Sequence, residues 1–168
     1  AVLGGALGAG GGYLWSKKMQ DQKLAMERAT VGTGVAVSKT TDNRLKLDIP
    51  SDVSFDTGRS AIKSNFAPIL SQFATSLNQN SVTTVTIIGH TDRLGTDDYN
   101  DKLSQARAKT VLAYIESLGV KAGTSVAQGR GKREPVTKSC SLTARGAQQI
   151  ACLQPDRRVM IEVMGVAR

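Results

Sequence analysis

The sequence predicts an α+β fold, a two-layer sandwich in which helices pack on one face of a mixed β-sheet. Apolar and polar residues alternate near 31–49 and 159–163, as in half-buried strands. Apolar residues recur at helical spacing in 61–78 and 103–118. The apolar run at 82–89 is typical of a buried strand. The predicted order is therefore hairpin, helix, strand, helix, strand, helix, strand.

The elements can be justified in chain order. Residues 17–29 carry mixed charges and predict a short polar helix or a linker. The turn signal Thr41-Asp42-Asn43 divides the hairpin, and Pro50 ends it. The helix at 103–118 is stopped by Gly119. Three later segments are shorter: 124–128 could be a strand, 142–150 a helix, and 159–163 the final strand.

The composition sets the broad class of the protein. A chain of 168 residues suits one domain and a short appendage. A hydrophobic content of 40% and a charged content of 21% exclude a wholly disordered, a collagen-like or a polytopic membrane chain. The net charge of +8 indicates an anionic partner or surface without identifying it. Only three Phe, three Tyr and one Trp are present, which argues against a nucleic-acid-binding module built on base stacking.

The amino-terminal segment differs from the rest of the chain. Its first sixteen residues carry no charge, and Gly4, Gly8 and Gly12 would share one face of a helix. Small residues at this spacing let helices approach closely in lipid, although the stretch is too short to span a bilayer. It is either the remnant of a membrane-associated glycine zipper or an unstructured glycine-rich leader. We expect residues 1–30 to form this leader and a linker, and residues 31–168 to form the domain.

The stretch from Gly89 to Gly119 contains the strongest candidates for a binding site. It runs from the end of a buried strand through a polar loop into a helix, and such loops are where sites usually lie. Ser104 is a suitable N-cap, which would place Arg107 in the first turn of the helix. The helix dipole disfavours a cation there, so Arg107 should have an anionic partner, such as a ligand carboxylate.

Asp92 lies where the preceding strand ends. It could hold an ammonium group, so that Asp92 and Arg107 would form a two-point receptor for a zwitterion. Alternatively, the two residues would form a structural salt bridge, with Asp92 in an Asx-turn. The residues alone leave both hypotheses open.

Several ordered motifs identify a family resemblance. Thr91-Asp92-Arg-Leu-Gly95 is followed by Tyr99-Asn100 and by Leu103-Ser-Gln-Ala-Arg-Ala108. The segments Val53 to Ile62, Gln128 to Gly131 and Asp156 to Val159 complete the pattern. With these motifs the chain resembles the OmpA-like peptidoglycan-binding domain family from residue 33 to residue 159, and the family's fold agrees with the α+β order above.

The resemblance implies a function and a set of binding residues. Members of the family bind peptidoglycan non-covalently through the diaminopimelate of the stem peptide, whose ammonium and carboxylate suit a two-point receptor. The family's binding Asp and Arg fall on Asp92 and Arg107, and its loop Asn falls on Asn100. Its last Arg falls on Arg158, and Thr57 is a further candidate. Many relatives carry Asn at the position after Thr57, where this chain has glycine.

The cysteines and the single histidine carry less information. Cys140 and Cys152 lie twelve positions apart, and the residues leave open a disulfide or two free thiols. The segment that holds them is similar to the same family, and the oxidising periplasm that this implies favours the disulfide. We expect its reduction to lower stability more than binding. His90 is expected to be a packed loop histidine, and we expect no metal or other cofactor.

The resemblance therefore implies a non-catalytic protein of the periplasm that tethers the outer membrane to the cell wall. The expected partners are peptidoglycan and, through the amino-terminal segment, the outer membrane, with oligomerisation through the zipper; no nucleic acid is expected. The leader is similar to those of small outer-membrane lipoproteins of the family, whose lipidated Cys would lie upstream of Ala1. The chain lacks a nucleophile elbow and a P-loop. Alternatively, the protein is a scaffold of an envelope assembly in which the zipper oligomerises and wall binding is secondary.

Overall fold

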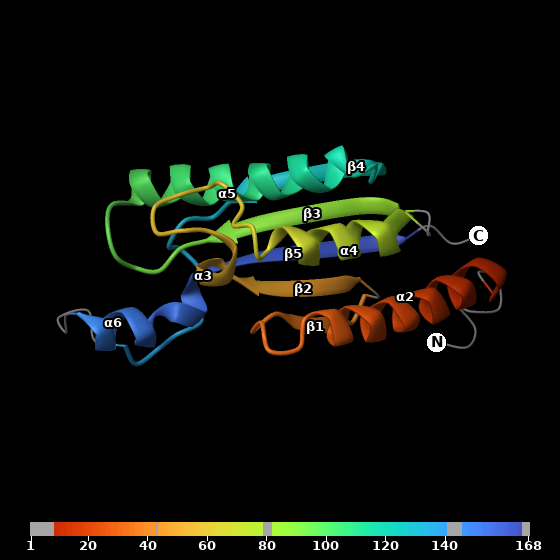
Figure 1. Ribbon diagram of the computed structural model, residues 1–168, viewed down its shortest axis with the longest axis horizontal. Helices are drawn as coiled ribbons and strands as arrows, with labels where there is room; N and C mark the ends of the chain where they lie inside the picture. Colours follow the sequence, from red (N-terminus) through yellow and green to blue (C-terminus); the bar gives the residue numbers. More distant parts are fainter. Residues whose placement is uncertain (1–8, 43, 79–81, 141–145, 166–168) are drawn as a thin grey trace.

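The computed structural model describes residues 9–42, 44–78, 82–140 and 146–165. Within them five strands form one sheet in the order β1-β2-β5-β3-β4 (Figure 1). Strands β3 and β4 are parallel, and the other neighbours are antiparallel, so the sheet is mixed, as predicted. The strands are β1 (Ala36–Lys39), β2 (Leu45–Pro50), β3 (Val82–His90), β4 (Ala122–Gly129) and β5 (Arg158–Gly165).

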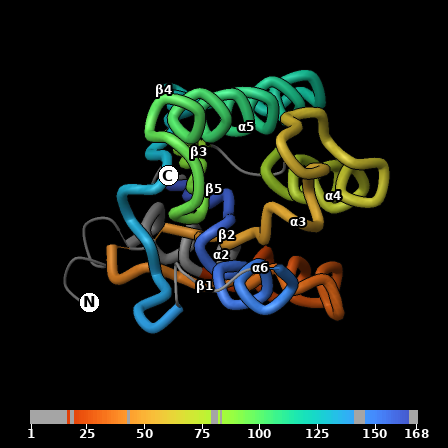
Figure 2. Tube along the Cα trace, turned by 90° about the vertical axis from the view of Figure 1, so that its left-hand side faces the viewer, coloured from red at the N-terminus to blue at the C-terminus, as the bar shows by residue number. Residues whose placement is uncertain are grey.

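The longer helices cover one face of this sheet. Figure 2 shows α2 and α4 on the same side of the strands, and α5 completes the layer over β3 and β4. The predicted α+β sandwich is therefore confirmed. The helices are α2 (Ala9–Ala29), α3 (Ser51–Ser54), α4 (Ala67–Asn78), α5 (Asp97–Ser117) and α6 (Ala147–Cys152), with a 3₁₀ turn, η1, at Gln154–Asp156.

The core lies between the two layers because the central strands alternate in burial. In β2 the side chains of Leu45, Leu47 and Ile49 are fully buried, and the residues between them are only half-buried. Leu47 pairs with Ile161 of β5, so apolar side chains of neighbouring strands meet on the helix-facing side. Phe73 of α4 packs into the same cluster. The alternation that predicted the strands is thus the pattern of their burial.

Helix α4 is shorter than the predicted 61–78. It begins at Ala67, and Phe66 N–H donates to Lys63 O (3.0 Å) in the turn before it. Lys63 N–H in turn donates to Ser54 O (2.8 Å), which holds the preceding chain in a loop. Ile62 packs against the core from this loop. Its apolar character fitted the helical spacing, and the spacing could not distinguish a loop residue from a helical one.

Helix α5 is longer than predicted, which corrects the role given to Ser104. Its N-cap is Thr96, whose hydroxyl accepts the N–H of Tyr99 (3.1 Å). Ser104 lies inside the helix, where its hydroxyl accepts the N–H of Gly131 (2.9 Å). Arg107 therefore lies in the middle of α5 and not in its first turn. The predicted effect of the helix dipole on Arg107 is therefore wrong. The polar first turns of α5 have no apolar periodicity, so the sequence pattern indicates a start that is too late.

Helix α2 includes the segment predicted as a polar helix or a linker. Met26 is fully buried in the core, and Gln22 Nε2 donates to Ser76 Oγ of α4 (2.9 Å). Its carboxyl-terminal part is thus packed on the domain, while its amino-terminal end projects at the end of the sheet where β3 begins (Figure 1). Gly4 and Gly8, two of the three glycines of the expected zipper face, lie outside the described residues. No described helix combines the length and the hydropathy needed to cross a bilayer.

Candidate functional site

A pocket of about 410 Å³ opens at the end of the sheet where β2 and β3 finish. This is the size expected of a small-molecule site. Its walls come from the loop before α4, the loop between β3 and α5, the first half of α5, and the segment from α6 to β5. The lining residues are Asp52, Phe55, Thr57, Gly58, Thr91, Asp92, Leu94, Gly95, Tyr99, Asn100, Leu103, Arg107, Ile150 and Arg157.

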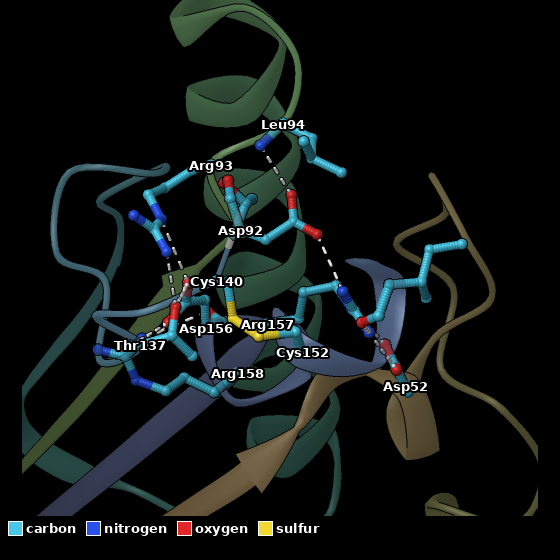
Figure 3. Close-up of polar contacts among 12 residues, drawn as sticks. Asp52, Asp92, Arg93, Leu94, Thr137, Cys140, Cys152, Asp156, Arg157 and Arg158 are labelled. Atoms are coloured by element: carbon cyan, nitrogen blue, oxygen red, sulfur yellow. Dashed lines mark hydrogen bonds and ion pairs between the residues drawn. A yellow bond between two sulfur atoms is a disulfide. The ribbon is translucent and has the colours of Figure 1, made fainter. Parts of the chain in front are cut away.

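Asp92 follows β3 and is held at both carboxylate oxygens. The N–H of Leu94 donates to its Oδ1 (3.0 Å), which is the expected Asx-turn. Its Oδ2 accepts a hydrogen bond from Arg157 Nη1 at 2.9 Å (Figure 3). The side chain of Asp92 is 14% exposed, so its carboxylate remains within reach of the pocket. The salt bridge between Asp92 and Arg107 considered from the sequence is therefore not formed in the described chain, and Asp92 pairs with Arg157 instead.

Arg157 links two carboxylates and the disulfide loop. Its Nε and Nη2 donate to the two oxygens of Asp52, both at 2.9 Å, and Nη2 also donates to Ile150 O at 3.0 Å. The hydrogen bond to Asp52 raises the pKa of Arg157 against the opposing effect of burial, and Asp92 adds to the rise. The guanidinium is thus a fixed positive charge between two acids.

Arg158, the expected binding residue, does not line this pocket. Adjacent residues of an extended chain point to opposite sides, so only one of the two arginines can face the ligand space. Arg158 is buried and donates to Asp156 O (3.2 Å) and Glu134 O (3.1 Å) on the other side (Figure 3). Of the two adjacent arginines, the structure places Arg157 at the pocket. The alternation of an extended chain was the signal that could have indicated this.

Arg107 reaches the pocket from the middle of α5 and is only 5% exposed. Its Nε donates to Arg59 O (2.8 Å) and its Nη2 to Asp56 O (3.2 Å). Its guanidinium carbon lies 5.0 Å from the centre of the Phe55 ring, a cation–π contact. Burial lowers the pKa of Arg107, and the charges of nearby acids, including Asp92, oppose this.

The contacts of Arg107 leave part of its guanidinium without a partner. Among the described residues no carboxylate lies within ion-pair distance of it, and its Nη1 makes no hydrogen bond there. A buried cation held only by carbonyls and a ring is poorly compensated. It therefore forms a ready receptor for an anion that enters the pocket.

Asn100 and Thr57 also line the pocket, in different settings. Asn100 is buried, and its Nδ2 donates to Leu94 O (2.7 Å), which fixes the loop that carries Asp92. Thr57 is exposed at the rim. Gly58 beside it has a φ of 69°, and an added Cβ would lie 3.0 Å from the Tyr99 hydroxyl. Apart from glycine, Asn is one of the residues that adopt such a φ most readily.

His90 and the cysteines have structural settings. His90 is packed, as expected, but it is the last residue of β3 and does not line the pocket. Burial lowers the pKa of His90 to about 4, and the positive charge of Arg158 adds to this. The predicted disulfide is present, with 5.7 Å between the Cα atoms of Cys140 and Cys152. The expected helix at 142–150 is seen as α6, and residues 142–145 lie outside the described residues.

The charges of the pocket balance. Two acids, Asp52 and Asp92, face two guanidinium groups, those of Arg107 and Arg157. Of the two guanidinium groups, only that of Arg107 has no carboxylate partner in the described chain. The charges of Asp52 and Asp92 both act on it across the pocket. The arrangement suits a ligand that has both charges on one small head.

The fold and the pocket define an OmpA-like domain, and the comparisons with known proteins agree. Residues 54–149 match the OmpA family, to which the chain therefore belongs. Over 121 residues the chain is 44% identical to Outer membrane protein A of Shimwellia blattae, a match that covers 70% of this chain and 50% of that protein. The chain thus spans about half the length of this relative, and about a third (34%) of the corresponding protein of Klebsiella aerogenes.

Two solved structures share the fold. The cell wall anchor of the T6SS from Pseudomonas aeruginosa has a TM-score of 0.67 and 26% identity, over 84% of this chain and 95% of that chain. The peptidoglycan-associated lipoprotein from Burkholderia pseudomallei has a TM-score of 0.52 and 28% identity, over 67% of this chain and 88% of that chain. Both agree with the helices and the mixed sheet described above.

Proposed function

We propose that this domain binds peptidoglycan non-covalently, by holding the diaminopimelate of the stem peptide in the pocket at the end of the sheet. The observation that carries the proposal is Arg107, a buried guanidinium that faces the pocket without a carboxylate partner in the described chain. The names of two similar structures, a cell wall anchor and a peptidoglycan-associated lipoprotein, support the same partner. The domain acts by binding alone, without catalysis.

The two charges of the ligand head have separate receptors. Arg107 takes the carboxylate, because its Nη1 has no partner among the described residues and its other nitrogens already fix the guanidinium plane. Asp92 takes the ammonium. Its present partner, Arg157, keeps two hydrogen bonds to Asp52, so the contact with Asp92 can weaken without leaving Arg157 unpaired. The head is neutral overall, so the pocket stays balanced when it binds.

Substitutions at the two receptors test the proposal. We expect Asp92→Ala and Arg107→Ala each to cost about 2–5 kcal/mol of affinity, because each leaves a buried charge of the complex unpaired. The measurement is co-sedimentation with purified sacculi, together with calorimetric titration of a soluble stem tripeptide that ends in meso-diaminopimelate. Asp98→Ala and Arg133→Ala, which change exposed ion-paired residues outside the pocket, serve as matched controls. If either pocket variant co-sediments with sacculi as the wild type does, the proposal is wrong.

We further infer that the protein works in the periplasm and tethers the outer membrane to the cell wall, with the segment before α2 at the membrane as in a lipoprotein. The glycine-rich sequence of that segment and the projection of α2 beyond the sheet support this. Removing residues 1–16 should abolish membrane association and any zipper-dependent oligomer while sacculus binding persists. An oligomer that survives the deletion unchanged would refute the zipper.

A further inference from the structure

One wall of the pocket comes from α6, the six-residue helix next to the disulfide. Its Ile150 lines the pocket although the side chain is 55% exposed. No side chain of α6 is buried, so this isoleucine does not serve the core of the domain. Its apolar surface is instead available to a molecule in the pocket.

Other exposed or half-buried apolar groups line the same space. Tyr99, in the first turn of α5, is 53% exposed, and Leu94 and Leu103 also line the pocket. The charged groups at Asp92 and Arg107 account for a zwitterionic head, but they leave these apolar surfaces unused. A linear aliphatic chain that leads away from such a head would cover them, and its burial would add affinity.

Two described contacts hold α6 at the pocket. Its last residue, Cys152, is bonded to Cys140, and Ile150 O accepts a hydrogen bond from Arg157 Nη2 (3.0 Å). The N-cap of the helix is Gly146, which offers no side-chain cap. A helix this short is not stable by itself. The covalent link to Cys140 and the same arginine that neutralises Asp92 therefore both help to hold it at the pocket.

We propose that the disulfide-closed segment is a specificity wall of the pocket, in which Ile150 contacts the aliphatic chain of the bound amino acid and the Cys140–Cys152 bond holds it there. This inference rests on the proposed function. The sequence alone indicated that opening the disulfide lowers stability more than binding. The position of α6 adds a direct loss of affinity for a ligand with an aliphatic chain.

The contact is tested by calorimetric titration of the full chain with the stem tripeptide that ends in meso-diaminopimelate. Ile150→Ala should weaken binding about fivefold, as expected for partial loss of apolar burial. Val136→Ala is the matched control, because Val136 is 51% exposed and does not line the pocket, and it should bind as the wild type does. Wild-type affinity of Ile150→Ala would overturn the inference.

The role of the disulfide is tested by a double-mutant cycle. Cys140→Ser with Cys152→Ser should weaken binding at least as much as Ile150→Ala does, and adding Ile150→Ala to that pair should change little further. A full fivefold loss in the disulfide-free background would show that the bond does not hold the wall. A thermal melt checks that each variant is folded, and Ile150→Ala alone tests the wall if the cysteine variants do not fold.

The two proposals fail in different ways. A wild-type chain that binds no tripeptide contradicts peptidoglycan recognition itself. A chain whose binding is lost in Arg107→Ala but unchanged in Ile150→Ala and in the disulfide-free variant contradicts only the wall.

Discussion

Two arginines at one pocket differ in how their charge is balanced. Arg157 is held between the carboxylates of Asp52 and Asp92, whereas Arg107 is held by carbonyls and the Phe55 ring. The contacts of Arg157 with Asp52 and Asp92 stabilise the domain without a ligand. The contacts of Arg107 leave its charge without a carboxylate partner in the described chain, and a ligand carboxylate would supply one. Ligand binding should therefore raise the melting temperature through mass action.

A single histidine should make stability depend on pH. The folded chain keeps His90 neutral, with a pKa of about 4 against 6.5 when it is unfolded. The unfolded state therefore binds the extra proton, and stability falls as the pH drops from 6.5 to about 4, by up to about 3 kcal/mol. Burial is the main cause of the lowered pKa of His90. The charges of Arg158, Arg130 and Lys46 lower this pKa further, and the charge of Glu134 raises it.

Urea denaturation at a series of pH values measures this effect. His90→Phe removes the titrating group and should flatten the loss of stability over that pH range. The Nδ1 of His90 has no partner in the described chain, so the apolar ring leaves no hydrogen bond broken at that atom. An unchanged slope in the variant would show that another group causes the loss.

At the scale of elements, glycine sets the distance between α5 and the sheet. A Cβ on Gly129 of β4 would lie 2.3 Å from the backbone nitrogen of Gln105, and one on Gly89 of β3 would lie 2.4 Å from Ser104 O. The helix backbone is thus in direct contact with two strands. This contact places Arg107 at the pocket, because Arg107 follows Gln105 by two positions on the same helix.

Gly129→Ala should therefore destabilise the domain by about 1–3 kcal/mol, as expected for overpacking against a backbone that cannot yield. Chemical denaturation measures the change. Ser125→Ala, at an exposed position of the same strand, should change stability by less than about 0.5 kcal/mol. Equal stabilities of the two variants would mean that α5 can move away from the sheet.

An apolar period predicts the buried elements well, and the bounds of elements that lack one are placed less accurately or missed. The apolar residues that predicted β2, β3, β5 and most of α4 are the residues that are buried in the structure. The polar start of α5 has no such pattern, so its N-cap was assigned eight residues too late, at Ser104 instead of Thr96. Four-residue α3 is too short to give a period.

The sequence predicted several residues of the candidate site but not the contacts between them. Motif resemblance located Asp92, Arg107 and Asn100, all of which line the pocket. It could not give the side-chain partners, so the contact between Asp92 and Arg157 appeared only in three dimensions. The choice between two adjacent arginines depends on which side of the chain faces the pocket, and a motif does not state this.

At the scale of the whole molecule, the net charge of +8 and the balanced pocket predict different responses to salt. Binding of the stem tripeptide should change by less than about threefold between roughly 50 and 200 mM salt, because the zwitterionic head is neutral overall. Any retention on duplex DNA should fall by about tenfold or more over the same range, through counterion release. Tripeptide binding that falls as steeply as DNA retention would indicate a non-specific basic surface.

The projection of α2 gives the domain two opposite ends. The helix leaves the domain where β3 begins, and the pocket lies where β3 ends (Figure 1). Tension between the first turn of α2 and a ligand at Asp92 would run along the strands, across their hydrogen bonds. The hydrogen bonds between β2, β5 and β3 would then all resist the sliding of one strand past the next at the same time, and would not break one after another. Such a load along the strands fits the tether proposed above.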